Sequence, residues 1–180
     1  MLRNAGAFIL AIVLVANGGC VLIDTRVKDE AITPLGASPF SGRYLCGASY
    51  TSHEMGLMGP SKLSDTLGGP ACESAALSYD VNAGLTVSFE KGGETLARRT
   101  IDRRTGLSVS EAGGLVIGSG SCGGGLGLGC YKTNLRLYVN RSGDLVIVQS
   151  GGGAGMLLLL PFAAYGRMMG VFPQLKPDAL

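Results

Sequence analysis

The stretch LRLYVNRSGDLVIV, residues 135–148, carries the clearest folding signal of the sequence. Its two runs of aliphatic, β-branched and aromatic residues, 135–139 and 145–148, are joined by five residues that include Gly143. Two such runs joined by a short glycine-containing connection are typical of a β-hairpin. We therefore predict two antiparallel strands here, with a turn between them.

Strand signals continue on the N-terminal side of this hairpin. In residues 85–90, LTVSFE, apolar and polar side chains alternate, which is the pattern of a half-buried strand. Residues 82–84, NAG, form a turn-type cluster between this strand and another at 78–81. Short strands separated by turns, with 30 glycines in the chain, predict a mainly β fold: a small antiparallel β-sandwich or barrel-like domain with glycine-rich loops.

Some segments leave alternatives open. Residues 71–77 and 95–104 fit either a strand or a short helical segment, and residues 47–70 read as a loop region with room for a short helix. Residues 151–173 carry a single charge, so a membrane-spanning helix is an alternative there to buried terminal strands or to a patch that docks on a partner or bilayer. Within that stretch, the glycines at 151–153 predict a turn before a last apolar strand that Pro161 interrupts.

The first twenty residues have the three parts of an export signal. A cationic head with Arg3 precedes the apolar run AGAFILAIVLVA, and the small residues Gly18 and Gly19 lead to Cys20. The apolar run is shorter than the roughly 20 residues that a membrane span needs. An ordinary cleaved secretory signal and an uncleaved anchor or buried helix are the alternatives.

Through Gly18-Gly19-Cys20, this segment resembles the signal of bacterial lipoproteins. The resemblance implies cleavage before Cys20, acylation of its sulfur by fatty acids such as palmitate, and a membrane anchor. Asn17 departs from the class, which usually has an aliphatic residue at that place. Val21 stands where an Asp often marks retention in the inner membrane, so the resemblance favours the periplasmic side of a Gram-negative outer membrane.

The expected organisation is a signal peptide over 1–19, an acylated N-terminus and tether over 20–42, and one β-rich domain over 43–180. The tether is expected to contribute a loop or an edge strand. A linker of this kind lets a domain stand off the bilayer.

The cysteine count supports this organisation independently. Five cysteines are an odd number, and acylation of Cys20 leaves an even set of Cys46, Cys72, Cys122 and Cys130 for an oxidising compartment. Four cysteines allow three connectivities, of which we favour the local pairs Cys46–Cys72 and Cys122–Cys130. The glycine-rich tract 113–130 then reads as a mobile loop closed by the second pair. No C-x₂-C pair favours zinc, and no metal or cofactor is expected.

Candidate functional side chains are few. The net charge of +2 gives no drive toward nucleic acid. Arg98, Arg99, Arg103 and Arg104 are a candidate binding surface for lipid phosphates, glycan or an acidic partner, although a solvated face is the simpler interpretation. The single histidine, His53, has Ser52 beside it and Asp65 further along, but an exposed loop histidine is favoured over a hydrolase site.

These observations predict a non-enzymatic, periplasm-facing lipoprotein that acts through a binding surface in the cell envelope. The alternative is a lipid-anchored inhibitor or immunity protein against a periplasmic toxin or lysozyme-type hydrolase, with the cystine-closed glycine-rich loop as a plug. A hydrolase built around His53 is the third and weakest class. The membrane is the expected partner through Cys20, with an envelope protein or a periplasmic hydrolase as the protein partner.

Overall fold

Most of the described chain is β-strand, as predicted. The computed structural model describes residues 21–23, 41–54, 57–110, 114–123, 127–157 and 160–176, so the predicted signal peptide and Cys20 lie outside the described residues. The elements in chain order are β1 (Val21–Ile23), β2 (Ser41–Leu45), β3 (Tyr50–Thr51), β4 (His53–Glu54), β5 (Leu57–Met58), α2 (Leu63–Leu67), β6 (Ser74–Asp80), β7 (Gly84–Lys91), β8 (Glu94–Ile101), the 3₁₀ turn η1 (Arg103–Thr105), β9 (Leu107–Val109), β10 (Leu115–Gly123), β11 (Gly127–Val139), β12 (Leu145–Leu157) and β13 (Leu160–Phe172).

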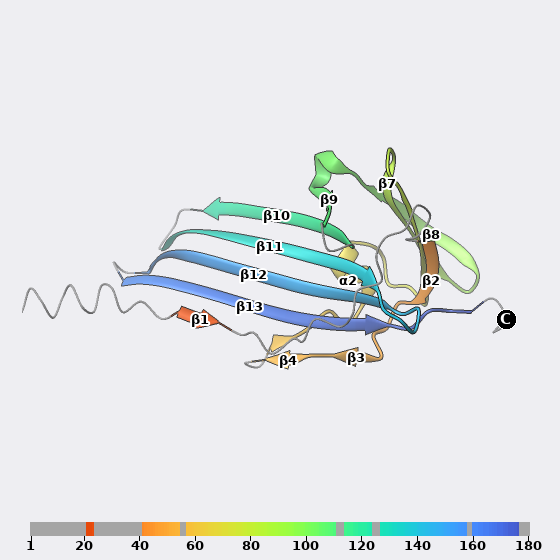
Figure 1. Ribbon diagram of the computed structural model, residues 1–180, viewed down its shortest axis with the longest axis horizontal. Helices are drawn as coiled ribbons and strands as arrows, with labels where there is room; N and C mark the ends of the chain where they lie inside the picture. Colours follow the sequence, from red (N-terminus) through yellow and green to blue (C-terminus); the bar gives the residue numbers. More distant parts are fainter. Residues whose placement is uncertain are drawn as a thin grey trace, which may run out of the picture.

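A long sheet and a small sheet make up the fold. The long sheet has the order β1-β13-β12-β11-β10-β9, and β3 also pairs with β13. Strands β10 to β13 are antiparallel to their neighbours and run side by side along most of the molecule, whereas β1 is parallel to β13 (Figure 1). The small sheet is an antiparallel meander of order β2-β6-β7-β8, and β4 and β5 form a separate short pair.

The predicted hairpin at 135–148 forms the centre of the long sheet. Val139 pairs with Leu145 at the end of the β11–β12 ladder next to the turn. In the turn, Asn140 Oδ1 accepts hydrogen bonds from the backbone amides of Ser142 and Asp144, both at 2.9 Å. Gly143 has a φ of 91°, a conformation that favours glycine. Local sequence chemistry thus accounts for this turn.

Two glycine-rich segments differ from their prediction. The described part of the tract 113–130, predicted as a mobile loop, contains all of β10 and the start of β11, which are paired from Leu115↔Leu137 to Gly123↔Gly129. The predicted turn at 151–153 lies inside β12, which is paired on both sides. Backbone hydrogen bonds to neighbouring strands hold these glycines in the sheet although their own strand propensity is low.

Other predictions agree with the observed elements. Residues 74–80 are strand, residues 94–101 are strand followed by the η1 turn, and a short helix, α2, lies in the loop region after β5. Pro161 is the second residue of β13 and therefore lies near a strand end, as expected. Val21–Ile23 forms an edge strand within the predicted tether.

The alternative of a membrane-spanning helix over 151–173 is wrong, because the described part of that stretch is strand. Within the described residues, no helix has both the length and the apolar character that a membrane crossing requires.

The main core lies between the small sheet and one end of the long sheet. The alternation predicted for residues 85–90 is confirmed, because Leu85, Val87 and Phe89 are fully buried. They belong to one buried cluster with residues of the long sheet such as Leu137 and Ile147. Figure 1 shows the small sheet against this end only, with the long strands projecting away from it.

The C-terminal tail joins the two sheets. After β13 the chain reaches the edge of β2, where Leu45 N donates to Pro173 O at 2.9 Å and Leu175 N donates to Arg43 O at 2.7 Å. These bonds pair the edge of the small sheet, which would otherwise expose unsatisfied backbone groups.

Candidate functional site

Both predicted disulfides are present. Cys46–Cys72 joins the chain just after β2 to the chain just before β6, with a Cα–Cα distance of 5.8 Å. Cys122–Cys130 joins directly opposite residues of β10 and β11. The two bridges use four of the five cysteines and leave Cys20, which is outside the described residues. No group of three or more metal-ligating side chains occurs in the described part of the chain.

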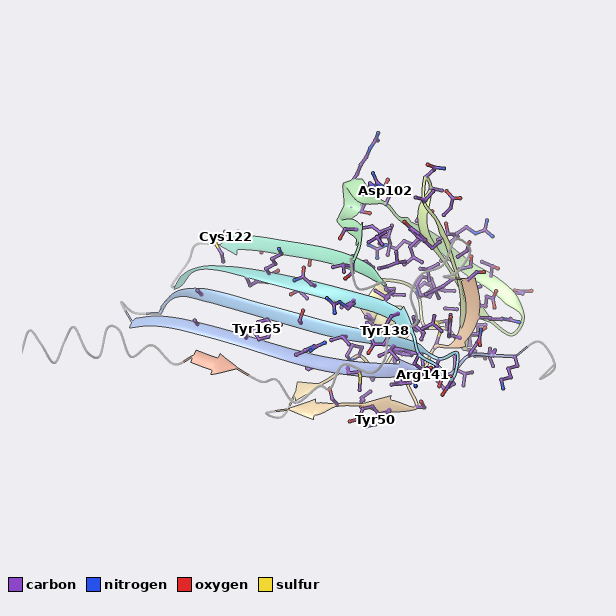
Figure 2. All side chains as sticks on the ribbon, viewed as in Figure 1. Tyr50, Asp102, Cys122, Tyr138, Arg141 and Tyr165 are labelled. Atoms are coloured by element: carbon purple, nitrogen blue, oxygen red, sulfur yellow. A yellow bond between two sulfur atoms is a disulfide. The ribbon has the colours of Figure 1, made fainter. Side chains whose placement is uncertain are left out.

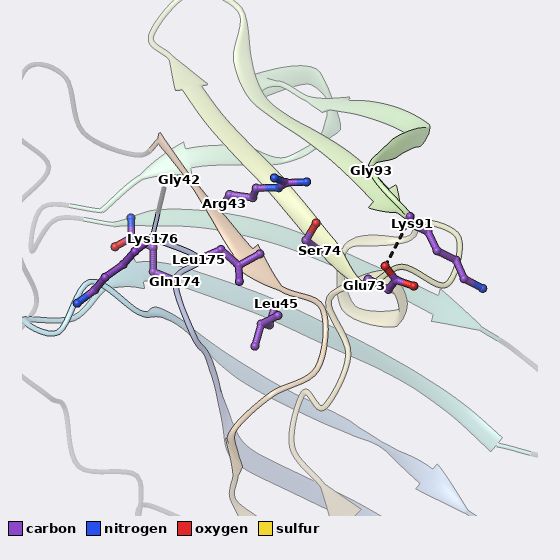
Figure 3. Close-up of a pocket in the computed structure, with 11 residues that line it drawn as sticks. Gly42, Arg43, Leu45, Glu73, Ser74, Lys91, Gly93, Gln174, Leu175 and Lys176 are labelled. Atoms are coloured by element: carbon purple, nitrogen blue, oxygen red, sulfur yellow. Dashed lines mark hydrogen bonds between the residues drawn. The ribbon is translucent and has the colours of Figure 1, made fainter. Parts of the chain in front are cut away.

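A groove of about 660 Å³ lies beside strand β2 (Figure 3). Its walls come from β2, from the chain entering β6, from the β7–β8 turn and from the C-terminal tail. Leu45 and Leu175 are apolar lining residues, and Lys91 and Lys176 are cationic ones. The groove therefore combines apolar surface with positive charge.

The other charged groups of this groove are engaged within the protein. Arg43 Nε and Nη2 both lie 2.6 Å from Glu90 Oε2. Ser74 Oγ donates to the same oxygen at 3.0 Å, and Glu73 Oε2 accepts from Gly92 N at 3.0 Å. These bonds hold the groove in shape, and they occupy its one hydroxyl side chain, Ser74. The arrangement fits binding of a ligand better than nucleophilic chemistry.

The four predicted arginines do not share one face. Successive residues of a strand point to opposite faces of its sheet, and Arg98 and Arg99 follow this rule on β8. Arg98 Nε donates to Ser88 Oγ at 3.2 Å on the outer face of the small sheet. Arg99 Nη1 donates to the carbonyls of Leu67 and Gly68, at 2.7 and 3.0 Å, and so caps the end of α2.

Arg103 and Arg104 lie together in η1 and are exposed. They line a groove of about 610 Å³ that also includes Tyr79, Asp102 and Leu107. Of the four predicted arginines, only Arg103 and Arg104 line the same groove, so one anionic group can contact both. Asp102, the N-cap of η1, holds the turn that carries these two arginines.

Asp102 and Thr105 form a reciprocal cap on η1. The Asp102 carboxylate accepts from the amides of Arg104 and Thr105, at 2.9 and 3.0 Å, and Asp102 N donates to Thr105 Oγ1 at 2.7 Å. The Thr105 backbone hydrogen bond, with smaller contributions that include the Arg104 charge, lowers the pKa of Asp102. The sequence motif DRRT, in which a cap residue is followed three positions later by a partner, is the signal that could have revealed this turn.

We expect Asp102→Asn to change the acid dependence of stability. A carboxyl with a lowered folded-state pKa stabilises the protein above its unfolded-state pKa, near 4, and this stabilisation is lost as pH falls through the folded-state value. Asn still caps η1, because its side-chain oxygen accepts the same bonds. Urea midpoints between about pH 2 and pH 6 should therefore fall less steeply with acid in the variant. Parallel acid profiles for the variant and the parent protein would contradict this role.

Two of the three residues considered for a hydrolase, Ser52 and Asp65, have structural partners. Ser52 is buried, and its Oγ accepts a hydrogen bond from Met169 N at 2.7 Å, which ties β3 and β4 to β13. Asp65 Oδ1 accepts from Ser64 Oγ at 3.1 Å within α2. His53 begins the short strand β4 rather than lying in a loop as predicted.

Figure 2 shows the labelled side chains across the fold, including Asp102 beside η1 and Tyr165 on the long sheet.

Sequence reasoning missed a basic face on the long sheet. The ladder pairs Asn134 with Ser150 and Ser150 with Arg167, so these residues share one face. Lys132 and Arg136 are two positions from Asn134 along β11 and lie on the same face. A hollow of about 360 Å³ on this face includes Arg136, Arg167 and Tyr165. The polar residues at every second position, 132, 134 and 136, are visible in the sequence. That Arg167 lies on the same face follows only from the strand register.

Comparison of the chain with protein-family models, with curated proteins and with solved structures finds no match.

Proposed function

We propose that the mature chain is a lipoprotein of the bacterial cell envelope, anchored by acylated Cys20 and acting through a binding surface rather than by catalysis. The observation that carries this proposal is the cysteine pairing. Four cysteines pair within the folded domain, which leaves Cys20 at the end of the export-signal-like segment for another chemistry.

The disulfides also support a location outside the cytoplasm. Paired cysteines persist in oxidising compartments such as the periplasm and are rare in reducing ones. Val21 after the acylated cysteine favours the outer membrane, facing the periplasm, on the lipoprotein resemblance.

The groove beside β2 is the surface we propose for the partner. It offers apolar contacts from Leu45 and Leu175 and positive charge from Lys91 and Lys176. Its own ion pair, Arg43–Glu90, is satisfied internally. A partner of the envelope with an apolar segment next to acidic groups fits this chemistry.

The alternative inhibitor function depended on a cystine-closed loop that plugs an active site. The described part of that tract, residues 114–123 and 127–130, is mostly paired strand, and Cys122–Cys130 is a cross-strand bridge within it. The geometry therefore favours the general binding function over this alternative.

Acylation is tested in the native host with an alkyne-bearing fatty acid. We expect the parent protein to incorporate the label and to fractionate with membranes, and Cys20→Ser to lose the label, since acylation needs the Cys20 sulfur. The matched control is the Cys122→Ser/Cys130→Ser variant, which should keep the label because those sulfurs are joined in a disulfide. Equal labelling of the Cys20→Ser and parent proteins would refute the anchor.

A further inference from the structure

The long sheet has a basic face that is turned away from the small sheet. Its charged and hydrogen-bonding side chains come from three strands and are those of Lys132, Asn134, Arg136, Ser150 and Arg167. Leu137 and Ile147 alternate with these positions along β11 and β12 and belong to the core that the long sheet shares with the small sheet. The basic face is therefore the side of the long sheet that the small sheet does not cover.

The charge of this face has one sign. Strands β10 to β13 contain Lys132, Arg136 and Arg167 and no Asp or Glu. Among the described residues, Lys132 and Arg136 have no partner in an ion pair or a side-chain hydrogen bond. An anionic ligand can therefore pair with these two cations without displacing an acidic side chain of the described fold.

The hollow of about 360 Å³ lies on this face. Asn134 and Ser150 pair directly across β11 and β12, and both line the hollow. Arg136 and Tyr165 line it as well. Gly118 lies opposite Asn134 on β10, and a Cβ there would be 3.2 Å from Asn134 Oδ1. The Asn134 amide thus lies beside the space that Gly118 leaves open.

The polar groups of the hollow are available to a ligand. In the described part of the fold, the Asn134 amide and the Ser150 hydroxyl have no hydrogen-bond partner, and neither group is buried from solvent. This differs from the groove beside β2, where the polar side chains of β2, β6 and β7 are bonded to one another. An amide and a hydroxyl both donate and accept hydrogen bonds, so they match the hydroxyls of a sugar.

The size and the lining of the hollow favour a small polar ligand over a protein segment. Cavities of about 300–1,000 Å³ are typical of small-ligand sites. Apart from Val116 and Val148, the described lining residues are polar, whereas the cores of protein interfaces are depleted of charged residues. Tyr165 is 44% exposed and lies on the part of the long sheet that projects beyond the small sheet (Figure 2). Its ring offers a flat surface on which the C–H face of a sugar can stack.

We propose that the basic face of the long sheet binds an acidic oligosaccharide. One sugar unit stacks on Tyr165 in the hollow, and its hydroxyls bond to Asn134 and Ser150. The acidic groups of the chain pair with Arg136 and Lys132. This site is separate from the groove beside β2 and does not depend on the lipid anchor, so the failure of one proposal leaves the other standing.

Titration calorimetry of the mature chain, purified from its own host, tests this proposal with three probes of six units each. Hexagalacturonate has a carboxylate on every sugar, its methyl ester is the same sugar chain without those charges, and hexaglutamate has side-chain carboxylates without sugars. We expect hexagalacturonate to bind at least about tenfold more tightly than either of the other two, because only it supplies both sugar contacts and charge. Added salt should weaken its binding, since exposed charges are screened.

Substitutions place the binding on the basic face. Arg136→Gln should weaken the affinity for hexagalacturonate about tenfold, the contribution of a charged hydrogen bond. Asn134→Ala should weaken it about fivefold and provides a second test if Arg136→Gln does not fold. The matched control is Arg141→Gln, which removes an exposed cation from the β11–β12 turn and should stay within about twofold of the parent protein. Far-ultraviolet circular dichroism checks that each variant is folded.

Three results would overturn the proposal. Equal affinities for hexaglutamate and hexagalacturonate would show that the site takes acidic peptides rather than sugars. Equal affinities for hexagalacturonate and its methyl ester would show that the cations of the face do not contribute. Absence of hexagalacturonate binding, or the same affinity in folded Arg136→Gln and Asn134→Ala as in Arg141→Gln, would show that the basic face is not the site.

Discussion

Replacing Phe89 by Ala is expected to destabilise the fold by about 3–5 kcal/mol, the cost of emptying a buried aromatic site. Phe89 is 0% exposed and lies on the core face of β7. Its neighbours across the ladder are Ala75 on β6 and Ala97 on β8, so the ring fills the space that two small residues leave. Gly69 closes the site, because a Cβ there would meet the Phe89 ring.

Chemical unfolding followed by far-ultraviolet circular dichroism measures this loss as a lower denaturant midpoint. The matched control is Leu96→Ala, an exposed residue of the adjacent strand β8. We expect that control to change stability by no more than about 0.5 kcal/mol. Similar midpoints for Phe89→Ala and Leu96→Ala would show that the core does not lie where the structure places it.

Removing the Cys46–Cys72 bridge is expected to cost about 3–4 kcal/mol, from the chain entropy that a bridge removes from the unfolded state. The two cysteines are 26 residues apart, and Cys46 is 3% exposed. The bridge also reinforces the hydrogen bond from Cys46 N to Glu73 O at the junction of β2 and β6. The variant is Cys46→Ser/Cys72→Ser, measured by the same unfolding experiment.

The Cys122→Ser/Cys130→Ser variant is the control for the loss of stability expected on removing the Cys46–Cys72 bridge. Its cysteines are eight residues apart and exposed, so the same chain-entropy argument gives a smaller loss of about 2–3 kcal/mol. The Cys46→Ser/Cys72→Ser variant also places two hydroxyls near the core, and burying them costs further stability. The difference in stability loss between the two double variants should therefore be larger than chain entropy alone gives. A larger loss for the Cys122–Cys130 bridge would contradict this ranking.

Local patterns predicted the fold where one strand's own residues decide its structure. The strand at 85–90 and the hairpin at 135–148 were both confirmed. Leu85, Val87 and Phe89 are buried on one face of β7, and residues 145–148 are buried on both faces of β12. The disulfide pairing was also predicted, because consecutive hairpins favour cysteines that are close in sequence.

The prediction failed where neighbours decide the structure. The glycines of 113–130 and 151–153 were assigned to loops and turns from their composition, yet those in the described strands are paired. The β10 glycines pair with β11, and Gly129 and the glycines at 151–153 pair on both sides. The same error hid the basic face, because Arg167 joins Lys132 and Arg136 only through the register of three strands. Arg98 and Arg99 were grouped by adjacency in the sequence, and strand geometry separates them.

In the proposed function, Cys20 is the acylated N-terminus of a disulfide-bonded domain. Mass spectrometry of the protein from its own host, as intact chain and as N-terminal peptide, with and without reduction, tests it most directly. We predict an N-terminal Cys20 that carries a diacyl or triacyl group, and a gain of two hydrogens per disulfide on reduction. An unmodified Cys20, or a chain that still begins at Met1, would contradict the account.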